Sequence, residues 1–135
     1  MIIIVLVMNM TDAYRIEALI ELAAAFPEPL TASEIARRRH IPAPFLGRLL
    51  AGVARDGVVT TSRRPRGGVR LSRPPEDTTL TTVLPETAPA AVGSPAIAWL
   101  SDRLAAARRA VLDHTTLSGL LAVERERRAE TDWQI

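Results

Sequence analysis

Arginines are the side chains best suited to do chemistry in this sequence. All 17 basic residues are Arg, and ten of them lie in residues 31–73 against only Glu34 and Asp56, which gives this segment a net charge of +8. The segments before and after it each carry −3. A positive block between two acidic ones is typical of a surface that meets a phosphate backbone. The alternative is a solvated basic face without a ligand.

The sequence lacks the residues that metal, nucleotide-binding and catalytic sites require. The chain has no Cys, which excludes disulfides, thiol nucleophiles, thiolate zinc sites and cysteine-ligated iron–sulfur clusters. His40 has no second ligand at helical spacing, so we expect no metal site. The glycine-containing residues 63–68 lack the spacing and the Lys-Ser/Thr pair of a P-loop. Without a nucleophile–base pair or a carboxylate dyad, we expect neither an enzyme nor a bound cofactor.

Two helices separated by a short break are predicted within residues 31–56. Thr31 and Glu34 have the capping-box spacing, which predicts the start of the first helix. Pro42 or Pro44 lies near the first turn of the second helix, which we predict over residues 44–56. Gly57 is expected to end this helix by supplying a left-handed position. The second helix has an apolar stripe for burial, formed by Leu46, Leu49, Leu50 and Val53.

The opposite side of helix 44–56 carries small residues and arginines, including Gly47, Arg48 and Arg55. Such a face can approach a DNA major groove closely, because nothing bulky intervenes. Gly47 and Gly52 each weaken the helix by roughly 1 kcal/mol relative to Ala. Close approach to DNA would explain this cost, and so would tight packing on a neighbouring helix.

A β-hairpin is predicted next, with strands at residues 58–62 and 69–71 and an Arg-rich tip between them. Arginines at such a tip can enter a minor groove or bind phosphates. The three arginines that end the first helix, Arg37 to Arg39, also complement its dipole. The candidate DNA-contacting residues are Thr31, Arg38, Arg39, Pro42, Pro44, Arg48, Arg55, Arg63, Arg64, Arg66, Gly67 and Arg70.

The N-terminal part of the chain begins with six aliphatic residues, 2–7, a run far too short to span a membrane and without the features of a signal peptide. It is a buried strand, a flap on the core or an over-called start, and we favour the last. A helix is predicted from Thr11 or Asp12 to Phe26. Its core face consists of Tyr14, Ala18, Leu19, Leu22 and Phe26.

The C-terminal part opens with Ser94 as the predicted cap of a helix over residues 95–114. Apolar residues recur along this helix with 3-4-3-4 spacing, which is typical of a helix-pairing seam, although packing on the chain's own core is the alternative. The predicted dimerisation residues on this stripe are Ile97, Leu100, Leu104, Ala107 and Val111. Trp99 lies off the stripe and is expected to pack on the preceding domain. The charged tail from Glu124 is expected to fray.

These segments, in this order, resemble the IscR-type (Rrf2) family of bacterial winged helix-turn-helix transcription regulators. The resemblance covers about residues 10–124. The predicted wing of this chain, residues 63–71, reads RRPRGGVRL and is similar to the family's R-G-P-G-G-G-Y-x-L. The other matching segments are residues 14–19, 30–50, 57–59, 74–77, 80–84, 99–104 and 115–118.

The resemblance implies a mainly α fold with a small β-hairpin wing. A winged helix-turn-helix domain would span residues 1–84, with 1–9 as an extension, followed by a linker at 85–94 and a dimerisation helix with a charged tail at 95–135. It implies a cytoplasmic homodimer that binds double-stranded DNA as a repressor, with helix 44–56 in the major groove and wing 63–70 in the minor groove or on phosphates. A small-molecule effector is possible and a membrane partner is not expected. The alternative is a winged-helix module that binds protein instead of DNA.

The departures from the family pattern concern its sensor and its DNA contacts. Members with an iron–sulfur cluster carry three Cys between the wing and the long helix, whereas residues 85–95 here contain neither Cys nor His. We therefore expect a regulator without a cluster. Gly47 stands where some members place a base-reading side chain, and Arg64 and Arg66 replace wing glycines. These changes favour binding that depends more on phosphate contacts.

Overall fold

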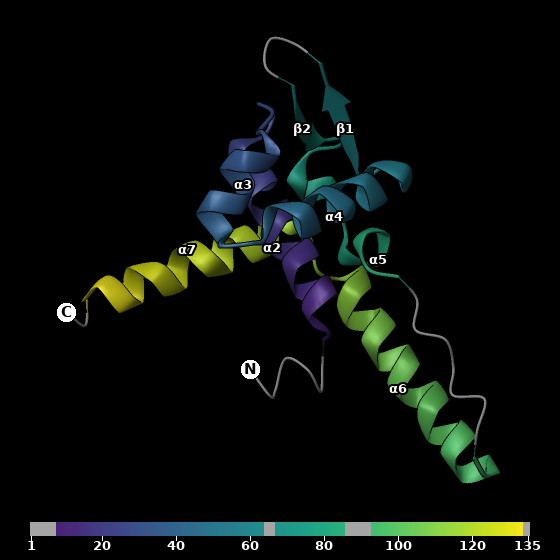
Figure 1. The fold of residues 1–135 in the computed structure, drawn as a ribbon. Coiled ribbons are helices and arrows are strands. Elements are labelled where there is room, and N and C mark those ends of the chain that lie inside the picture. Colours follow the sequence, from purple (N-terminus) through teal and green to yellow (C-terminus); the bar gives the residue numbers. More distant parts are fainter. Residues whose placement is uncertain (1–7, 64–66, 86–92, 134–135) are drawn as a thin grey trace.

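Helix α2 (Met10–Ala25) runs through the middle of the molecule, and α3 (Ala32–Arg39), α4 (Ala43–Arg55), β2 (Gly68–Leu71) and α7 (Leu117–Trp133) pack on it (Figure 1). The computed structural model describes residues 8–63, 67–85 and 93–133. Three segments discussed above lie outside this part of the chain: the aliphatic run at residues 2–7, the tip residues Arg64 and Arg66, and most of the linker. The described elements are α2 (Met10–Ala25), α3 (Ala32–Arg39), α4 (Ala43–Arg55), β1 (Val59–Ser62), β2 (Gly68–Leu71), the 3-10 helix η1 (Pro75–Asp77), α5 (Leu80–Val83), α6 (Pro95–Asp113) and α7 (Leu117–Trp133).

The starts of α2 and α3 are set by side-chain caps. Asn9, not Thr11 or Asp12, caps α2, because its Oδ1 accepts the N–H of Asp12 at 2.8 Å. The predicted capping box of α3 is confirmed. The Thr31 hydroxyl accepts the N–H of Glu34 at 3.2 Å, and the Glu34 carboxylate accepts the N–H of Thr31 at 2.8 Å. The backbone hydrogen bond from Thr31 lowers the pKa of the Glu34 carboxyl below its ordinary value.

The break between α3 and α4 is a tight turn. His40 adopts a left-handed conformation with φ of 54° and ends α3. Ile41 follows with only 3% of its surface exposed, so it plugs the space between the two helices. Pro42 then occupies the cap position of α4. At the far end of α4, Gly57 has φ of +79° and supplies the left-handed position that was predicted from the sequence.

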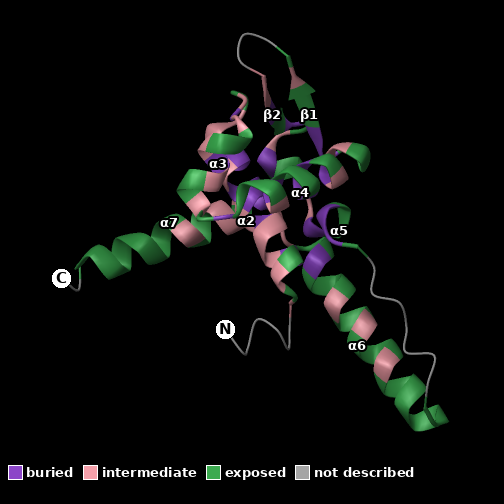
Figure 2. Ribbon diagram, viewed as in Figure 1, coloured by how far each residue is buried: buried purple, intermediate pink, exposed green. Residues whose placement is uncertain are grey.

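The hydrophobic core lies between α2, α3, α4 and the hairpin (Figure 2). Leu19 and Leu22 of α2 are fully buried at its centre, and Ile35 of α3 packs with them. The predicted core face of α2 is confirmed. Tyr14, at one end of this face, is half-buried and meets the Phe45 ring edge-on, with 5.6 Å between ring centroids.

The hairpin pairs Val59 with Leu71 and Ser62 with Gly68. A further bridge ties it to the segment before α3. The N–H of Leu30 donates to the carbonyl of Val69 at 2.9 Å, and the N–H of Val69 donates back at 2.8 Å. The wing is therefore fastened directly to the start of the helix-turn-helix.

The structure corrects two expectations for the C-terminal part of the chain, one for α7 and one for α6. The tail does not fray from Glu124, because α7 continues to Trp133 and its first residue, Leu117, is fully buried against the core. Trp99 does not pack on the preceding domain. It is 62% exposed, and the guanidinium of Arg103 lies 5.0 Å from its ring centroid. None of the described helices is both long and apolar enough to cross a membrane.

Gly68 gives the first prediction. Its φ is +142°, and a Cβ added there would lie 3.0 Å from the backbone oxygen of Leu30. Gly68→Ala should therefore lower the free energy of unfolding by about 1–3 kcal/mol, measured by urea denaturation. Gly52→Ala is the matched control. A Cβ at Gly52 meets nothing within 4 Å, so this change should stabilise α4 by up to about 1 kcal/mol. A Gly68→Ala protein as stable as the wild type would contradict this account.

Candidate nucleic-acid interface

Helix α4 divides cleanly into a buried and an exposed side. The predicted stripe of Leu46, Leu49, Leu50 and Val53 is buried, whereas Arg48 and Arg55 on the other side are exposed. Gly47 is also exposed, and a Cβ at Gly47 or Gly52 would meet nothing within 4 Å. Packing among the described residues therefore does not explain either glycine. The outer face of α4 is free of bulk and carries positive charge.

The start of α4 and the hairpin add further candidate residues. Pro42 and Pro44 are exposed at the first turn of α4. Arg63 and Arg70 are exposed on the hairpin, and Gly67 has a left-handed φ of +71°. The Thr31 hydroxyl is already engaged in the capping box of α3. Arg64 and Arg66 lie outside the described residues, so their predicted contacts remain predictions.

The three arginines that end α3 have different surroundings. Arg37 is exposed, and Arg38 has 44% of its side chain exposed and lies 3.5 Å from the Glu21 carboxylate. Arg39 points inward, with only 7% of its side chain exposed. Successive residues on a helix point about 100° apart, which separates the exposed arginines from the buried one.

Arg39 was predicted to contact DNA, but the structure turns its guanidinium toward carboxylates of the same chain. The guanidinium donates to both carboxylate oxygens of Glu124 at 2.5 and 2.8 Å, to Glu21 at 2.8 Å, and to Glu17. A buried guanidinium needs such partners, since an unpaired charge in the interior costs several kcal/mol, on the order of 3–5. Arg39 thus joins α3 to α2 and α7, and four of its five N–H groups are used by these carboxylates.

Sequence reasoning missed the three carboxylates that surround Arg39. One signal was available, because Glu17 and Glu21 stand four residues apart on α2 and repel each other unless a cation lies between them. Glu124 is 85 residues from Arg39 and gave no local signal. The hydrogen bonds from Arg39 hold the pKa of the Glu124 carboxyl below its ordinary value. In return, Glu124 raises the pKa of the Arg39 guanidinium.

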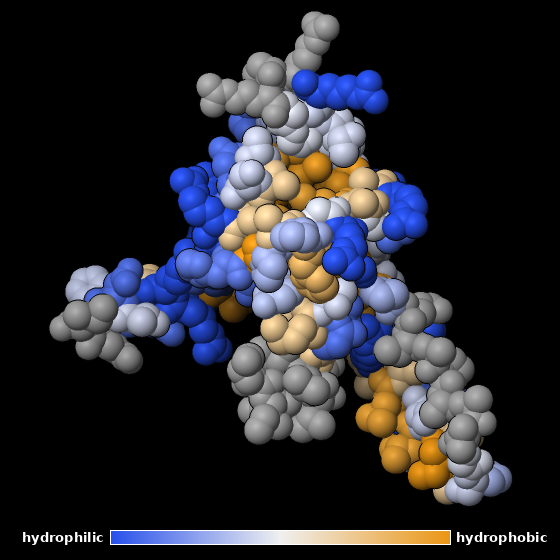
Figure 3. Space-filling model, viewed as in Figure 1, coloured by the Kyte–Doolittle hydropathy of each residue, from blue (hydrophilic) through white to orange (hydrophobic). Residues whose placement is uncertain are grey.

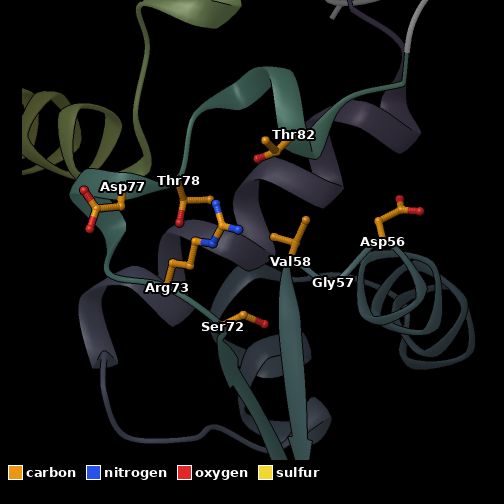
Figure 4. Close-up of a pocket in the computed structure, with 8 residues that line it drawn as sticks. All are labelled: Asp56, Gly57, Val58, Ser72, Arg73, Asp77, Thr78 and Thr82. Atoms are coloured by element: carbon orange, nitrogen blue, oxygen red, sulfur yellow. The ribbon is translucent and has the colours of Figure 1, made fainter.

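A small cavity of about 110 Å³ lies at the base of the wing (Figure 4). It is lined by the end of α4, the hairpin and the segment from η1 to α5. Arg73 and Thr78 extend into the middle of the view, while Asp56 and Asp77 lie at its margins. Thr78 already donates to the carbonyl of Pro74 at 3.1 Å. Helix α6 does not contribute to the lining.

The hairpin, the helix pair and the long helix occur together in a known family of regulators. Residues 8–122 match the model of Rrf2, which is described as an iron-dependent transcriptional regulator. The chain belongs to the Rrf2 family. This confirms the predicted family and, with the fold above, the winged helix-turn-helix class. The family consists of transcriptional regulators, not enzymes.

Individual relatives agree with this assignment. A Synechocystis protein described as an HTH-type transcriptional regulator is 37% identical over 73 residues, which are 53% of this chain and 49% of that protein. The HTH-type regulator IscR of Cereibacter sphaeroides is 32% identical over 74 residues, 53% of this chain and 48% of that protein. The chain spans about half the length of these curated relatives. The solved structure of T. potens IscR has a TM-score of 0.74 at 23% identity and covers 88% of each chain, which is a likeness of fold.

The iron in the family's description does not fit the residues of this chain. There is no Cys to supply a thiolate. Among the described residues, no group of three or more His, Asp or Glu side chains could hold a metal ion.

Glu124 gives a prediction for the dependence of stability on pH. Its folded pKa is lowered from the ordinary value of 4.5, so its contribution is present above that value and is lost as pH falls through the folded pKa. Glu124→Gln should lower the free energy of unfolding by about 1 kcal/mol at neutral pH. The deficit relative to wild type should shrink as the pH falls below 4.5 and vanish once the pH is below the folded pKa of Glu124. Urea titrations at neutral and at acidic pH measure this effect.

Glu126→Gln is the control, because Glu126 is an exposed residue of the same helix. It should match the wild type at both pH values. Equal stability of wild type and Glu124→Gln at neutral pH would show that the Arg39–Glu124 contact does not stabilise the fold.

Proposed function

We propose that this protein is a homodimeric, DNA-binding transcriptional regulator of the cytoplasm that acts as a repressor without an iron–sulfur cluster. Helix α4 enters the major groove, and the wing lies in the minor groove or on the adjacent phosphates. Occupying a promoter is enough to repress it, so repression needs no surface beyond the DNA contacts themselves. An effector, if this regulator has one, is a small molecule or a protein.

The exposed face of α4 carries this proposal. The core fixes one side of the helix, and the other presents Arg48 and Arg55 around the unobstructed Gly47. Residues 31–73, which contain α3, α4 and the hairpin, hold a net charge of +8 in a chain whose total is +2. Charge concentrated on a helix-turn-helix and wing favours a polyanion as partner. A protein partner would not require this concentration of arginine.

The exposed stripe of α6 supports the homodimer. Ile97, Leu100 and Leu104 are 46%, 47% and 62% exposed, and Val111 is 64% exposed. Along α6 only Leu112 is buried among the residues that the structure describes, so the stripe does not pack on the chain's own core. Figure 3 shows hydrophobic surface, in orange, gathered along one side of α6. A second copy can cover them, and a two-fold dimer would place two α4 helices about one DNA turn, roughly 34 Å, apart.

Arg48→Ala tests the proposed DNA contact of α4. Duplexes retained by the wild-type protein from genomic DNA serve as the probe. Loss of a base contact by Arg48→Ala should weaken binding by about 1–3 kcal/mol and relax the sequence preference. Loss of a phosphate contact should instead reduce the slope of log affinity against log salt by about 0.9.

Arg125→Ala, which removes an exposed arginine from α7, is the matched control and should change binding little. Equal losses in the two variants would contradict the assignment of α4. If the wild-type protein retains no duplex at low salt but associates with a protein, the alternative of a protein-binding winged helix is correct.

Leu104→Glu tests the dimer. It places a charge in the middle of the stripe, and light scattering should show a monomer at concentrations where the wild type is a dimer. Ala106→Glu puts the same charge on the opposite side of α6 and should leave the dimer intact. A Leu104→Glu protein that remains dimeric would remove α6 from the interface.

A further inference from the structure

Among the described residues, hydrogen bonds attach helix α7 to the rest of the molecule at two separate places. Near its start, the N–H of Leu80 donates to the carbonyl of Thr115 at 2.9 Å, and the N–H of Leu117 donates to the carbonyl of Thr78 at 3.0 Å. Further along, the Glu124 carboxylate accepts both ends of the Arg39 guanidinium. Seven residues of helix separate these places, which is about 10 Å along the axis. Two attachments at that distance fix the direction of the helix.

The second attachment connects α7 directly to the helix-turn-helix. Arg39 is the last residue of α3, and His40 and Ile41 then make the turn into α4. Its paired hydrogen bonds to Glu124 are charge-assisted and bidentate, the geometry in which an arginine–carboxylate contact is strongest and most directional. Burial of the Arg39 side chain keeps water from competing with these bonds. The turn before α4 is thereby held at a fixed position relative to α7.

The same arrangement determines where α6 points. Helices α6 and α7 are joined by a turn of three residues, 114–116, whose backbone pairs with residues 78–80. On the α6 side, the attachments lie in its C-terminal part, where Leu112 is buried, Asp113 accepts the Thr81 hydroxyl and Arg108 donates to the carbonyl of Pro85 at 3.5 Å. The rest of α6 extends away from the body (Figure 1). Within this bent arm of α6 and α7, helix α7 also packs on α2, whereas the Arg39–Glu124 contact ties it to the end of α3.

We infer that Arg39 is a positioning residue for DNA binding. Through Glu124 it fixes the helix-turn-helix relative to the α6–α7 arm, and so it sets the separation of the two α4 helices in the dimer. This inference rests on the proposed function. It assigns to Arg39 a role quite different from the phosphate contact expected from its sequence position.

The length of α6 makes this restraint important, because a small change in the direction of the helix moves its far end by a large distance. The 19 residues of α6 span about 28 Å. A tilt of roughly 10° moves the far end by about 5 Å, which exceeds the rise of one base pair, about 3.4 Å. An arm free to tilt by that amount would place the second α4 out of register with its half-site.

The direction in which one substitution changes DNA affinity distinguishes a positioning role from a purely electrostatic one. Glu124→Gln removes a negative charge, and electrostatics alone would then strengthen binding to DNA. Loss of positioning weakens binding instead, and only where two half-sites must be met together. Arg39→Lys keeps the positive charge but loses the bidentate geometry, so it should behave like Glu124→Gln. Glu126→Gln changes the charge of the same helix equally without touching Arg39.

The binding experiment uses a duplex retained by the wild-type protein, the same duplex with one half-site scrambled, and a third with one base pair inserted between the half-sites. Relative to Glu126→Gln, Glu124→Gln should lose about tenfold in affinity for the intact duplex. It should bind the half-site duplex equally well, keep the salt slope, and discriminate less against the insertion. Circular dichroism at the assay temperature verifies that each variant is folded.

A second measurement needs no DNA. Because the chain has no Cys, Ala51→Cys introduces a single site for a spin label on the outer face of α4. Pulsed electron resonance of the dimer should give a narrow distance distribution between the two labels, and Glu124→Gln should broaden or shift it. An unchanged distribution overturns the positioning role even if DNA binding is confirmed.

The remaining outcomes are also decisive. Equal or tighter binding by Glu124→Gln, or equal losses on intact and half-site duplexes, would overturn the inference and leave the proposed function standing. A wild-type protein that retains no duplex would overturn the proposed function and this inference together.

Discussion

The burial of α2 is the constraint on which the rest of the structure depends. Its apolar face, centred on Leu19 and Leu22, is covered from different sides by α3, α4, β2 and α7. Because one helix serves as the common packing partner, each neighbour must turn its own apolar side toward it. The polar and charged sides of these neighbours then face solvent, because the opposite sides are buried. The exposed arginines of α4 are in this sense a product of the core, since four buried residues on that helix leave them no other direction.

Arginine serves two opposite purposes within one short helix. Arg38 and Arg39 are neighbours in sequence, yet Arg38 keeps 44% of its side chain exposed whereas Arg39 is enclosed by three carboxylates. The difference follows from helix geometry, because Arg39 contacts both Glu17 and Glu21 on the acidic side of α2, whereas Arg38 reaches Glu21 from the exposed side at 3.5 Å. A high density of arginine is therefore an incomplete guide to a phosphate-binding surface. Some of that density holds the fold together.

Sequence reasoning succeeded where the deciding contacts are local. The capping box of Thr31 and Glu34 and the left-handed Gly57 each act within a few residues, and each was predicted. It failed where a distant partner decides. The inward turn of Arg39 depends on Glu124, and the persistence of α7 depends on that contact and on Leu117 meeting the core. Trp99 illustrates a different failure, because a large apolar residue was assumed to find cover within its own chain.

The bridge between Leu30 and Val69 has a consequence for how this protein meets other copies of itself. By pairing with Val69, Leu30 blocks the middle of the β2 edge that would otherwise accept another strand. The outer edge of β1 is only four residues long, with Thr60 and Thr61 exposed. A short, polar edge beside a cluster of arginines is a poor template for strand addition, because like charges repel an approaching second wing. The wing is thus protected against aggregation by its own construction.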